Sequence, residues 1–229
     1  MINSTLLNDA VQHYVRHQHI FERFKNVVVD YFKLEPALNV YGNSIIYTVK
    51  SRLKDPDHLL DKIKRKGGRG TEITPNNIFN EITDLAGVRI LHLYQDQFPI
   101  IHQHIMRNIE SGEWFFHEQP VVYSWDPEAT EFFKTLGLRT DIKDSYYTSI
   151  HYVVKPREDS NIFCEIQVRT LFEEIWGEID HSINYPHPTS SQACREQLRV
   201  LSKLVSTGTR LADSIYRTSI EHLLGSADK

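Results

Sequence analysis

A short alternating segment, residues 164–170, most constrains how this chain can fold. Its sequence is CEIQVRT, in which apolar and polar residues alternate as in a half-buried β-strand. The polar face carries Glu165, Gln167 and Arg169, whose burial without partners would cost free energy. We therefore expect these side chains to line a cleft. A carboxylate suits a metal ion or a proton and an arginine suits phosphate, which together indicate chemistry on a nucleotide phosphate.

Helical and strand-like segments alternate along the rest of the chain. Amphipathic helices are expected at about 5–28, 55–66, 97–110, 126–135, 172–183 and 191–223, with a short one after 74–75, and strands at about 43–50, 87–93, 114–124, 147–154 and 161–168. This pattern predicts an α/β (α+β) fold in a single domain, 1–229, with a mixed sheet of about five strands flanked by helices. About 40–185 would form its core, after an N-terminal helix in 1–35 and before a C-terminal helix at 191–223. The side chains expected to face inward from that last helix are Leu198, Leu201, Val205, Leu211, Ala212 and Ile215.

The composition is that of an ordinary globular protein, with 40% of the 229 residues hydrophobic and 24% charged. No apolar run approaches the roughly 18 residues of a membrane span, and residues 1–5 lack the character of a signal peptide. The two cysteines, Cys164 and Cys194, are not in metal-ligand spacing. We therefore expect a cytoplasmic protein without a membrane partner, and the net charge of −4 argues against binding DNA.

Positive charge is concentrated in residues 50–69, although the whole chain is acidic. This segment has eight basic and three acidic residues, a local charge of +5. The basic residues are Lys50, Arg52, Lys54, Lys62, Lys64, Arg65, Lys66 and Arg69. Such a run is either a solvated helix face or a site for a polyphosphate.

Polar groups from several expected strands should converge on one face of the sheet. They are Thr48 and Lys50 in the first strand, Tyr147, Ser149 and His151 in the hairpin arm, Glu165, Gln167 and Arg169 in the last strand, and Asp84, which precedes the strand of Arg89. Each alone has a simpler explanation: Asp84 could cap a turn, Tyr147 could be a half-buried strand tyrosine, and His151 an edge histidine. Together, converging cations, two carboxylates and an aromatic ring indicate a magnesium–nucleotide site.

Four segments, in order, resemble the synthetase domain of the RelA/SpoT family, whose members make the alarmones pppGpp and ppGpp. Residues 84–89 match the family's D-x-x-G-x-R segment, and residues 143–151 resemble its K-x-x-G-Y-x-S-x-H segment. Residues 165–170 match its E-I-Q-x-R-T strand, and Lys50 with residues 62–66 resembles its basic ATP-binding segment. The resemblance covers roughly 40–185, which is most of the chain.

The resemblance implies a reaction in which the 3′-hydroxyl of GDP or GTP attacks the β-phosphorus of ATP, so that pyrophosphate is transferred and AMP leaves. It implies that Asp84 and Glu165 hold Mg²⁺ and that Glu165 also assists deprotonation of the hydroxyl. The residues implied to bind ATP are Lys50, Lys62, Arg65, Lys66 and Arg89. Those implied to bind the acceptor nucleotide are Lys143, Ser149, His151, Gln167 and Arg169, with Tyr147 stacking on the guanine.

The chain departs from the family pattern at the two nucleotide sites. The family's first strand has R-x-K, with the arginine packing on adenine, whereas Thr48 stands here two residues before Lys50. Arg52 has the same strand parity and is our candidate for contacting the adenine of ATP instead. Tyr146 stands where the family commonly has glycine, and its side chain would narrow or reshape the acceptor site.

Three functions are compatible with these residues. The first is an alarmone synthetase acting on GDP or GTP. The second is the same transfer onto an adenine nucleotide or the 3′ end of a tRNA, as in toxic relatives, which the net charge of −4 makes less favourable. The third is a catalytically silent nucleotide-binding module, against which the retained Asp84 and Glu165 argue. Relatives of this length often form tetramers through terminal helices, so helix 191–223 is a candidate for homo-oligomer contacts, although packing onto its own domain is the simpler expectation.

Overall fold

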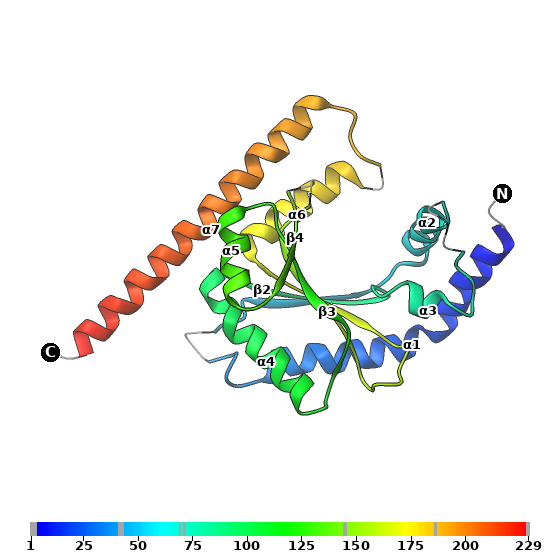
Figure 1. Cartoon of the computed structure of the whole chain (residues 1–229), viewed down its shortest axis with the longest axis horizontal. Helices are drawn as coiled ribbons and strands as arrows, with labels where there is room; N and C mark the ends of the chain where they lie inside the picture. The colour runs from blue at the N-terminus through cyan, green and yellow to red at the C-terminus, as the bar shows by residue number, and fades with distance from the viewer. Residues whose placement is uncertain are drawn as a thin grey trace.

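The fold is a six-stranded mixed sheet flanked by helices (Figure 1), which confirms the expected fold class. The computed structural model describes residues 4–40, 44–68, 70, 72–143, 146–185 and 187–227. Arg69 of the basic segment, and Asp144 and Ser145 of segment 143–151, lie outside these residues. None of the helices in the described ranges combines the length and hydropathy needed to span a membrane.

The elements alternate along the chain much as the sequence predicts. The helices are α1 (Ser4–Leu34), α2 (Pro56–Gly67), α3 (Ile78–Glu81), the short 3₁₀ helix η1 (Gln95–Gln97), α4 (Phe98–Glu110), α5 (Pro127–Thr135), α6 (Leu171–Asn184) and α7 (Gln192–Ala227). The strands are β1 (Thr48–Leu53), β2 (Ala86–His92), β3 (Phe115–Tyr123), β4 (Arg139–Asp141), β5 (Ser149–Lys155) and β6 (Cys164–Thr170).

The strand order is β1-β2-β6-β5-β3-β4. The pairs β2–β6 and β3–β4 are parallel, and the other three neighbouring pairs are antiparallel. The sheet therefore places β2 and β6, which are distant in sequence, side by side. The expected five strands become six because β4 has only three residues, too few to produce an alternating pattern.

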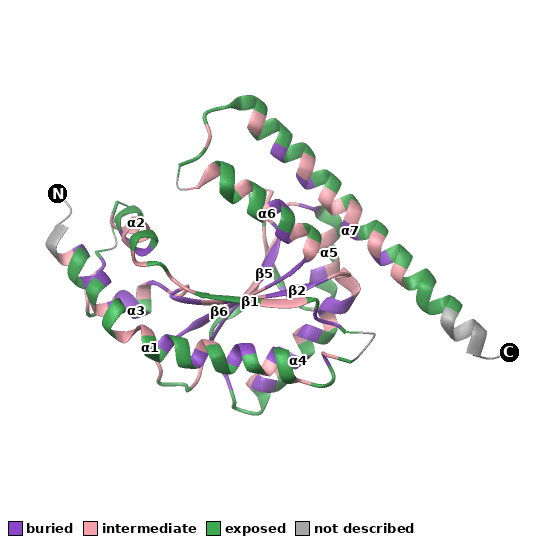
Figure 2. Ribbon diagram, turned by 180° about the vertical axis from the view of Figure 1, so that it is seen from behind, coloured by how far each residue is buried: buried purple, intermediate pink, exposed green. Residues whose placement is uncertain are grey.

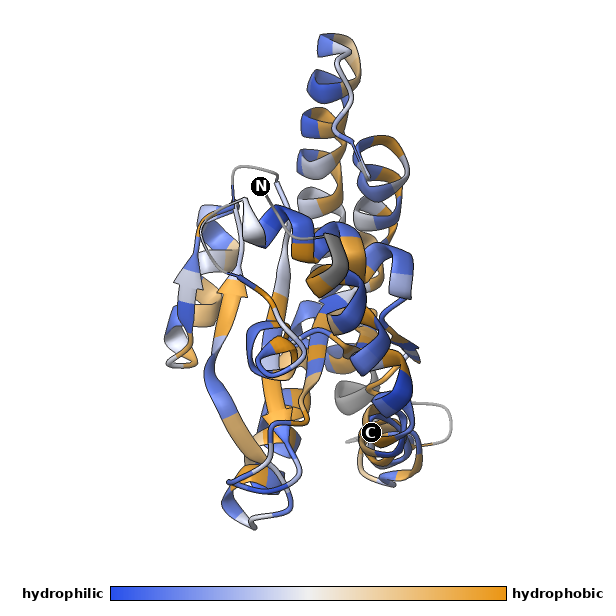
Figure 3. Cartoon of the chain, turned by 90° about the vertical axis from the view of Figure 1, so that its right-hand side faces the viewer, coloured by the Kyte–Doolittle hydropathy of each residue, from blue (hydrophilic) through white to orange (hydrophobic). Residues whose placement is uncertain are grey.

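One face of the sheet is apolar and forms the core with α1 and α4, which lie across it (Figure 1). Val88 and Ile90 of β2 and Ile166 and Val168 of β6 are all fully buried on this face. Buried residues follow the stripes of both helices that face the sheet (Figure 2), and hydrophobic residues are also prominent along the strands (Figure 3). Because side chains alternate along a strand, the intervening polar residues must project from the opposite face.

Tyr14 of α1 ties this core to the end of β1 and the start of β2. Its ring is fully buried, and its hydroxyl donates to the carbonyl oxygens of Lys54 at 3.0 Å and Leu85 at 3.1 Å. Both acceptors adjoin residues that face the polar side of the sheet. The helix therefore fixes the backbone that carries part of the candidate site.

Three local expectations are wrong. The first strand begins at Thr48 rather than at about 43, and α3 begins at Ile78 rather than directly after 74–75. In α7, Leu211 and Ile215 are both 61% exposed instead of facing inward. This stretch of α7 packs on the body through the buried Thr209 and Asp213, so Leu211 and Ile215 lie on the opposite side of the helix; only the part beyond it projects from the molecule (Figure 1).

Polar side chains form much of the inward face of α7. Leu198 is buried as expected, but Ser202, Thr209 and Asp213 are also buried. The helix packs near Asp96 and Asp126, to which it contributes Arg217 and Arg210. Its apolar stripe therefore did not indicate the packed face.

Candidate active site

A row of polar side chains crosses four neighbouring strands on the face of the sheet opposite α1. Lys50 pairs with Arg89, Arg89 with Gln167, and Gln167 with His151. In the adjacent row, Glu165 stands opposite Gly87. The backbone hydrogen bonds of the sheet therefore bring together residues that the sequence analysis selected from separate motifs.

A cavity of about 520 Å³ lies over this polar face, beneath α6. Eight of the predicted site residues line it: Lys50, Arg52, Asp84, Arg89, Tyr147, Glu165, Gln167 and Arg169. The side of α6 that faces it contributes Gly177, Glu178, Asp180, His181, Asn184 and Tyr185. This helical wall was not predicted from the sequence, although a polar stripe at helical spacing directly follows the β6 motif.

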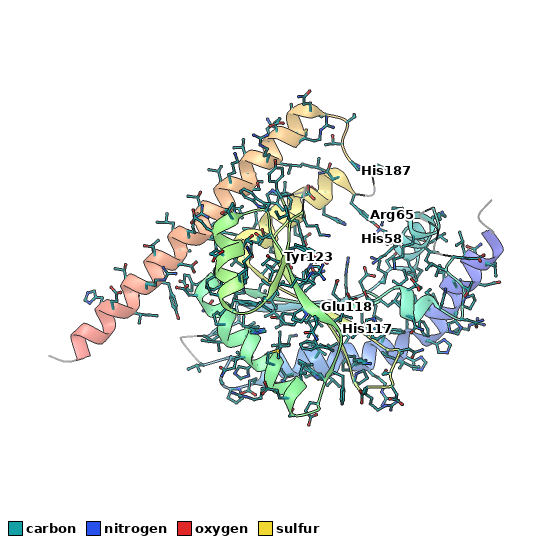
Figure 4. The ribbon with its side chains drawn as sticks, in the orientation of Figure 1. His58, Arg65, His117, Glu118, Tyr123 and His187 are labelled. Carbon is teal, nitrogen blue, oxygen red and sulfur yellow. The ribbon has the colours of Figure 1, made fainter. Side chains whose placement is uncertain are left out.

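The end of α6 also contacts α2. The rings of His58 and Tyr185 meet edge to face, with centroids 5.1 Å apart, and Tyr185 stacks on His181 at 4.5 Å. His58 and Arg65 lie on the side of α2 that is turned toward α6 (Figure 4). The cavity is thus bounded by the sheet, α6 and this contact with α2.

Asp84 lies between two lysines at one end of the cavity. Its oxygens are 3.0 Å from Nζ of Lys54 and 2.7 Å from Nζ of Lys62. Burial alone would raise the pKa of Asp84, but the two ammonium groups outweigh it and lower the pKa to about 2. Asp84 is therefore ionised near neutral pH. Lys54 was not among the predicted site residues, although it has the strand parity of Lys50 and Arg52.

Glu165 is also held as a carboxylate. Its Oε1 lies 3.1 Å from Nδ1 of His151, and its Oε2 accepts a hydrogen bond from Nε2 of Gln167 at 2.7 Å. Burial opposes ionisation, but the hydrogen bond with His151 and the charge of that ring hold the pKa of Glu165 below its ordinary value. The other nitrogen of His151 lies 3.0 Å from the hydroxyl of Tyr147. Glu165, His151 and Tyr147 thus form a connected chain.

Carboxylates on α6 hold the cations of the row. Glu174 contacts Lys50 at 3.0 Å, Arg89 at 3.1 Å and Arg169 at 3.2 Å, and Glu178 contacts Arg89 at 2.5 Å. Arg169 and Glu174 are almost fully buried, so their ion pair is screened little by water. Neither glutamate was predicted from the sequence. Both are positioned by the start of α6, where Thr170 and Glu173 form a capping box.

Of the predicted acceptor residues, Arg169 and His151 contact Tyr147, whereas Lys143, Ser149 and His151 do not line the cavity. Arg169 donates to the hydroxyl of Tyr147 at 2.6 Å. Lys143 lies with Nζ 4.1 Å from the ring centroid of Tyr123, an aromatic residue that the sequence analysis did not select. Ser149 is fully buried, so its side chain is not on the cavity surface.

Three predicted ATP-binding residues, Lys62, Arg65 and Lys66, do not line the cavity. Lys66 donates to the backbone carbonyl of Glu81 and lies near its carboxylate. Arg65 is exposed on α2 and does not contribute to the cavity lining. Of the α2 cations, Lys62 is the one that reaches Asp84.

Tyr146 has an unusual backbone conformation. Its φ angle is +61°, in the left-handed region where a side chain is strained and glycine is not. Its ring meets that of Trp125 edge to face at 5.4 Å and points away from the cavity lined by Tyr147. The substitution expected to narrow the acceptor site therefore places its side chain elsewhere.

Comparisons with known proteins identify the family to which this chain is similar. A family model described as "Region found in RelA / SpoT proteins" matches residues 51–190, more than half of the chain. The GTP pyrophosphokinases YwaC and YjbM of Bacillus subtilis are 26% and 27% identical over 151 and 153 residues, which cover 64% and 63% of this chain. These alignments span 61% and 59% of the lengths of those two proteins.

Solved structures show the same fold at lower identity. Small alarmone synthetase 1 from Bacillus subtilis, bound to its product pppGpp, has a TM-score of 0.68 at 22% identity, covering 93% of this chain and 99% of that one. A GTP pyrophosphokinase family protein from Streptococcus pneumoniae has a TM-score of 0.70 at 19% identity, covering 92% and 95%. From the match to the family model over more than half of its length, the chain belongs to the RelA/SpoT family.

Proposed function

We propose that this chain transfers the β,γ-pyrophosphoryl group of ATP to the 3′-hydroxyl of GDP or GTP. A bond forms between the 3′-oxygen and the β-phosphorus, the bond from that phosphorus to the α,β-bridging oxygen breaks, and AMP leaves. The observation that carries the proposal is the placement of two ionised carboxylates, Asp84 and Glu165, in one cavity with Lys50, Arg89 and Arg169. The names of the curated relatives support the same reaction.

Glu165 is the group best placed to act on the acceptor hydroxyl. It is ionised, lines the cavity, and is oriented on both sides by His151 and Gln167. A carboxylate held in this way can orient the 3′-hydroxyl and accept its proton as the new O–P bond forms. His151 then acts through Glu165 by fixing its orientation.

The donor triphosphate would lie among the cations of β1, β2 and α2. Lys50, Arg52 and Arg89 line the cavity, and Lys62 of α2 contacts the lining residue Asp84. Carboxylates of α6 pair with Lys50 and Arg89, so phosphate oxygens would compete with Glu174 and Glu178 for these two cations. Phosphoryl-type transfer depends mainly on such positioning and charge neutralisation.

Asp84 and Glu165 also fit a magnesium ion. Both are hard oxygen donors, both are ionised near neutral pH, and both line the same cavity. Within the described ranges, no group of three or more metal-ligating side chains is present, so phosphates and water would supply the remaining ligands. Bound Mg²⁺ would offset the charge that develops on the phosphate oxygens.

The acceptor base would stack on Tyr147. This ring lines the cavity beside Arg169, whose guanidinium carbon lies 5.1 Å from the ring centroid. Lys143 and Tyr123 lie toward β3, beyond His151 in the sheet. The donor and acceptor sides therefore lie at opposite ends of the same polar row.

The test is incubation of the purified protein with Mg²⁺ and γ-labelled ATP, offering GDP, GTP, ADP and deacylated tRNA as separate acceptors. We expect labelled ppGpp from GDP and labelled pppGpp from GTP, with loss of transfer but retained nucleotide binding in Glu165→Gln. Label on ADP or tRNA alone would retain the chemistry and replace the acceptor. Nucleotide binding without transfer to any acceptor would overturn the proposal in favour of a binding module.

A further inference from the structure

A second cavity, of about 290 Å³, lies between α5, α6 and α7, which are neighbours in the fold (Figure 1). It is separate from the candidate active site, since the two cavities share no lining residue. Its walls combine aromatic side chains from the body of the protein with Ser202, Thr209 and Asp213 from the polar inward face of α7. This explains why a helix with an apolar stripe turns hydroxyl and carboxylate groups toward its own domain.

Three aromatic residues form one side of this cavity. Trp125 and Tyr146 meet edge to face, with ring centroids 5.4 Å apart. Trp176 is 3% exposed, and its Nε1 donates to the carbonyl oxygen of Leu198 at 3.0 Å. Because that N–H is already used, Trp176 can offer a ligand only its ring. Aromatic faces attract cations and pack well against apolar groups.

The charges of the lining residues are strongly unbalanced. Five carboxylates, those of Asp96, Asp126, Glu128, Glu173 and Asp213, face two guanidinium groups, a formal charge of −3. Both guanidinium groups are already paired at the rim. Arg210 contacts Asp126 at 2.7 Å and Glu128 at 3.4 Å, and Arg217 contacts Asp96 at 2.6 Å.

Unlike the other three acids of the lining, Glu173 and Asp213 form no direct ion pair among the described residues. Glu173 accepts the backbone N–H of Thr170 at 2.7 Å, and Asp213 accepts that of Asp96 at 3.4 Å. Burial raises the pKa of Glu173 to about 7 and also raises the pKa of Asp213, and the charge of Asp213 adds to the effect on Glu173. The two carboxylates are therefore near each other, and the charges of Arg169 and Arg217, which favour the ionised forms, do not offset the effect of burial.

We propose that this cavity binds a small organic cation, a primary amine attached to an apolar or aromatic body. The ammonium group would lie between Glu173 and Asp213, and the body would pack against Trp125, Tyr146 and Trp176. Phosphate-bearing ligands are disfavoured by the charge of −3. The chemistry is thus opposite to that of the cavity over the sheet, where lysines and arginines gather.

An occupant would contact the reverse side of the segment that carries Tyr147. Tyr146 and Thr148 line the second cavity, while Tyr147 lines the first. Likewise, Trp176 lines the second and its neighbour Gly177 the first. One loop and one helix therefore separate the two cavities.

The test uses the full chain and three amines as probes, phenethylamine, agmatine and spermidine, with 2-phenylethanol as the neutral counterpart of phenethylamine. Binding is measured by calorimetry and by tryptophan emission, since two of the three tryptophans line the cavity. We expect saturable binding of at least one amine and none of the alcohol. Glu173→Gln combined with Asp213→Asn should weaken that binding at least tenfold, whereas Glu113→Gln, at an exposed carboxylate before β3, should not.

A second variant keeps the test decisive if the first variant does not fold. Ala129→Phe adds a ring at a lining position of α5 without removing any polar group, and it should also weaken binding at least tenfold. The thermal transition of each variant shows whether it is folded. Absence of saturable amine binding to the unmodified chain, equal binding of the alcohol, or unchanged affinity in folded Ala129→Phe would each overturn the proposal.

Discussion

Nδ1 of His151 lies 3.1 Å from Oε1 of Glu165, and this contact helps to hold the pKa of that carboxyl below its ordinary value. Removal of the imidazole in His151→Ala should therefore raise the pKa of Glu165. Because the ionised form is the active one, the acid-side decline of kcat/KM should move to higher pH. Rate profiles between pH 5 and 9 test this, with exposed His19→Ala as the control. If the acid-side decline of kcat/KM does not move in His151→Ala, Glu165 is not the group whose protonation causes it.

Lys62 and Lys66 offer a matched comparison, because they lie one turn apart on α2 and contact different acids. Lys62 reaches Asp84 in the cavity, whereas Lys66 contacts Glu81 of α3. Loss of a charge-assisted contact to the triphosphate in Lys62→Ala should lower kcat/KM for ATP on the order of tenfold or more. Lys66→Ala should change kcat/KM for ATP less than about twofold, because Lys66 contacts Glu81 and not the triphosphate. Equal losses in steady-state assays would show that both lysines act on the nucleotide.

Asp84 should make stability depend on pH. Its pKa of about 2, against an ordinary value of 3.8, corresponds to about 2 kcal/mol of stabilisation. This contribution is fully present above the unfolded-state pKa and is lost as pH falls toward the folded-state pKa. Urea unfolding of the parent chain and Asp84→Asn should therefore show a difference that is large at pH 7 and smaller at pH 3. A difference independent of pH would contradict the ionised pair with Lys54 and Lys62.

At position 146, glycine should give a more stable protein than alanine. Tyr146→Ala and Tyr146→Gly both remove the contact with Trp125, so they differ only at the backbone. At a φ of +61°, alanine keeps the steric strain that glycine lacks, and Tyr146→Gly should be the more stable variant by about 1 kcal/mol. Chemical denaturation of the two variants measures this directly. Equal stability would mean that this residue does not hold a left-handed conformation in solution.

The alternation of residues 164–170 was sufficient to predict which face of β6 is buried and which carries the chemistry. Cys164, Ile166 and Val168 are fully buried, and Glu165 and Gln167 line the cavity. Period-two alternation has this predictive value because a strand has only two faces. The converging residues of β1, β2 and β5 followed from the same rule.

Contacts between distant segments were not accessible in this way. Lys54 belongs to the site because Asp84 lies 3.0 Å away, and Glu174 because the start of α6 passes over Lys50 and Arg89. Only the three-dimensional packing of these elements sets such distances. The prediction of the inward face of α7 was wrong for a related reason. Periodicity identifies an apolar face, but not which face a neighbouring element covers.

The row from Lys50 through Arg89 and Gln167 to His151 fixes the separation between donor and acceptor sides. Adjacent strands are about 4.8 Å apart, so three steps span about 14 Å. This length is set by backbone hydrogen bonds, which do not vary with the identity of the side chains. Substitutions along the row would therefore leave the span between the proposed donor and acceptor ends unchanged.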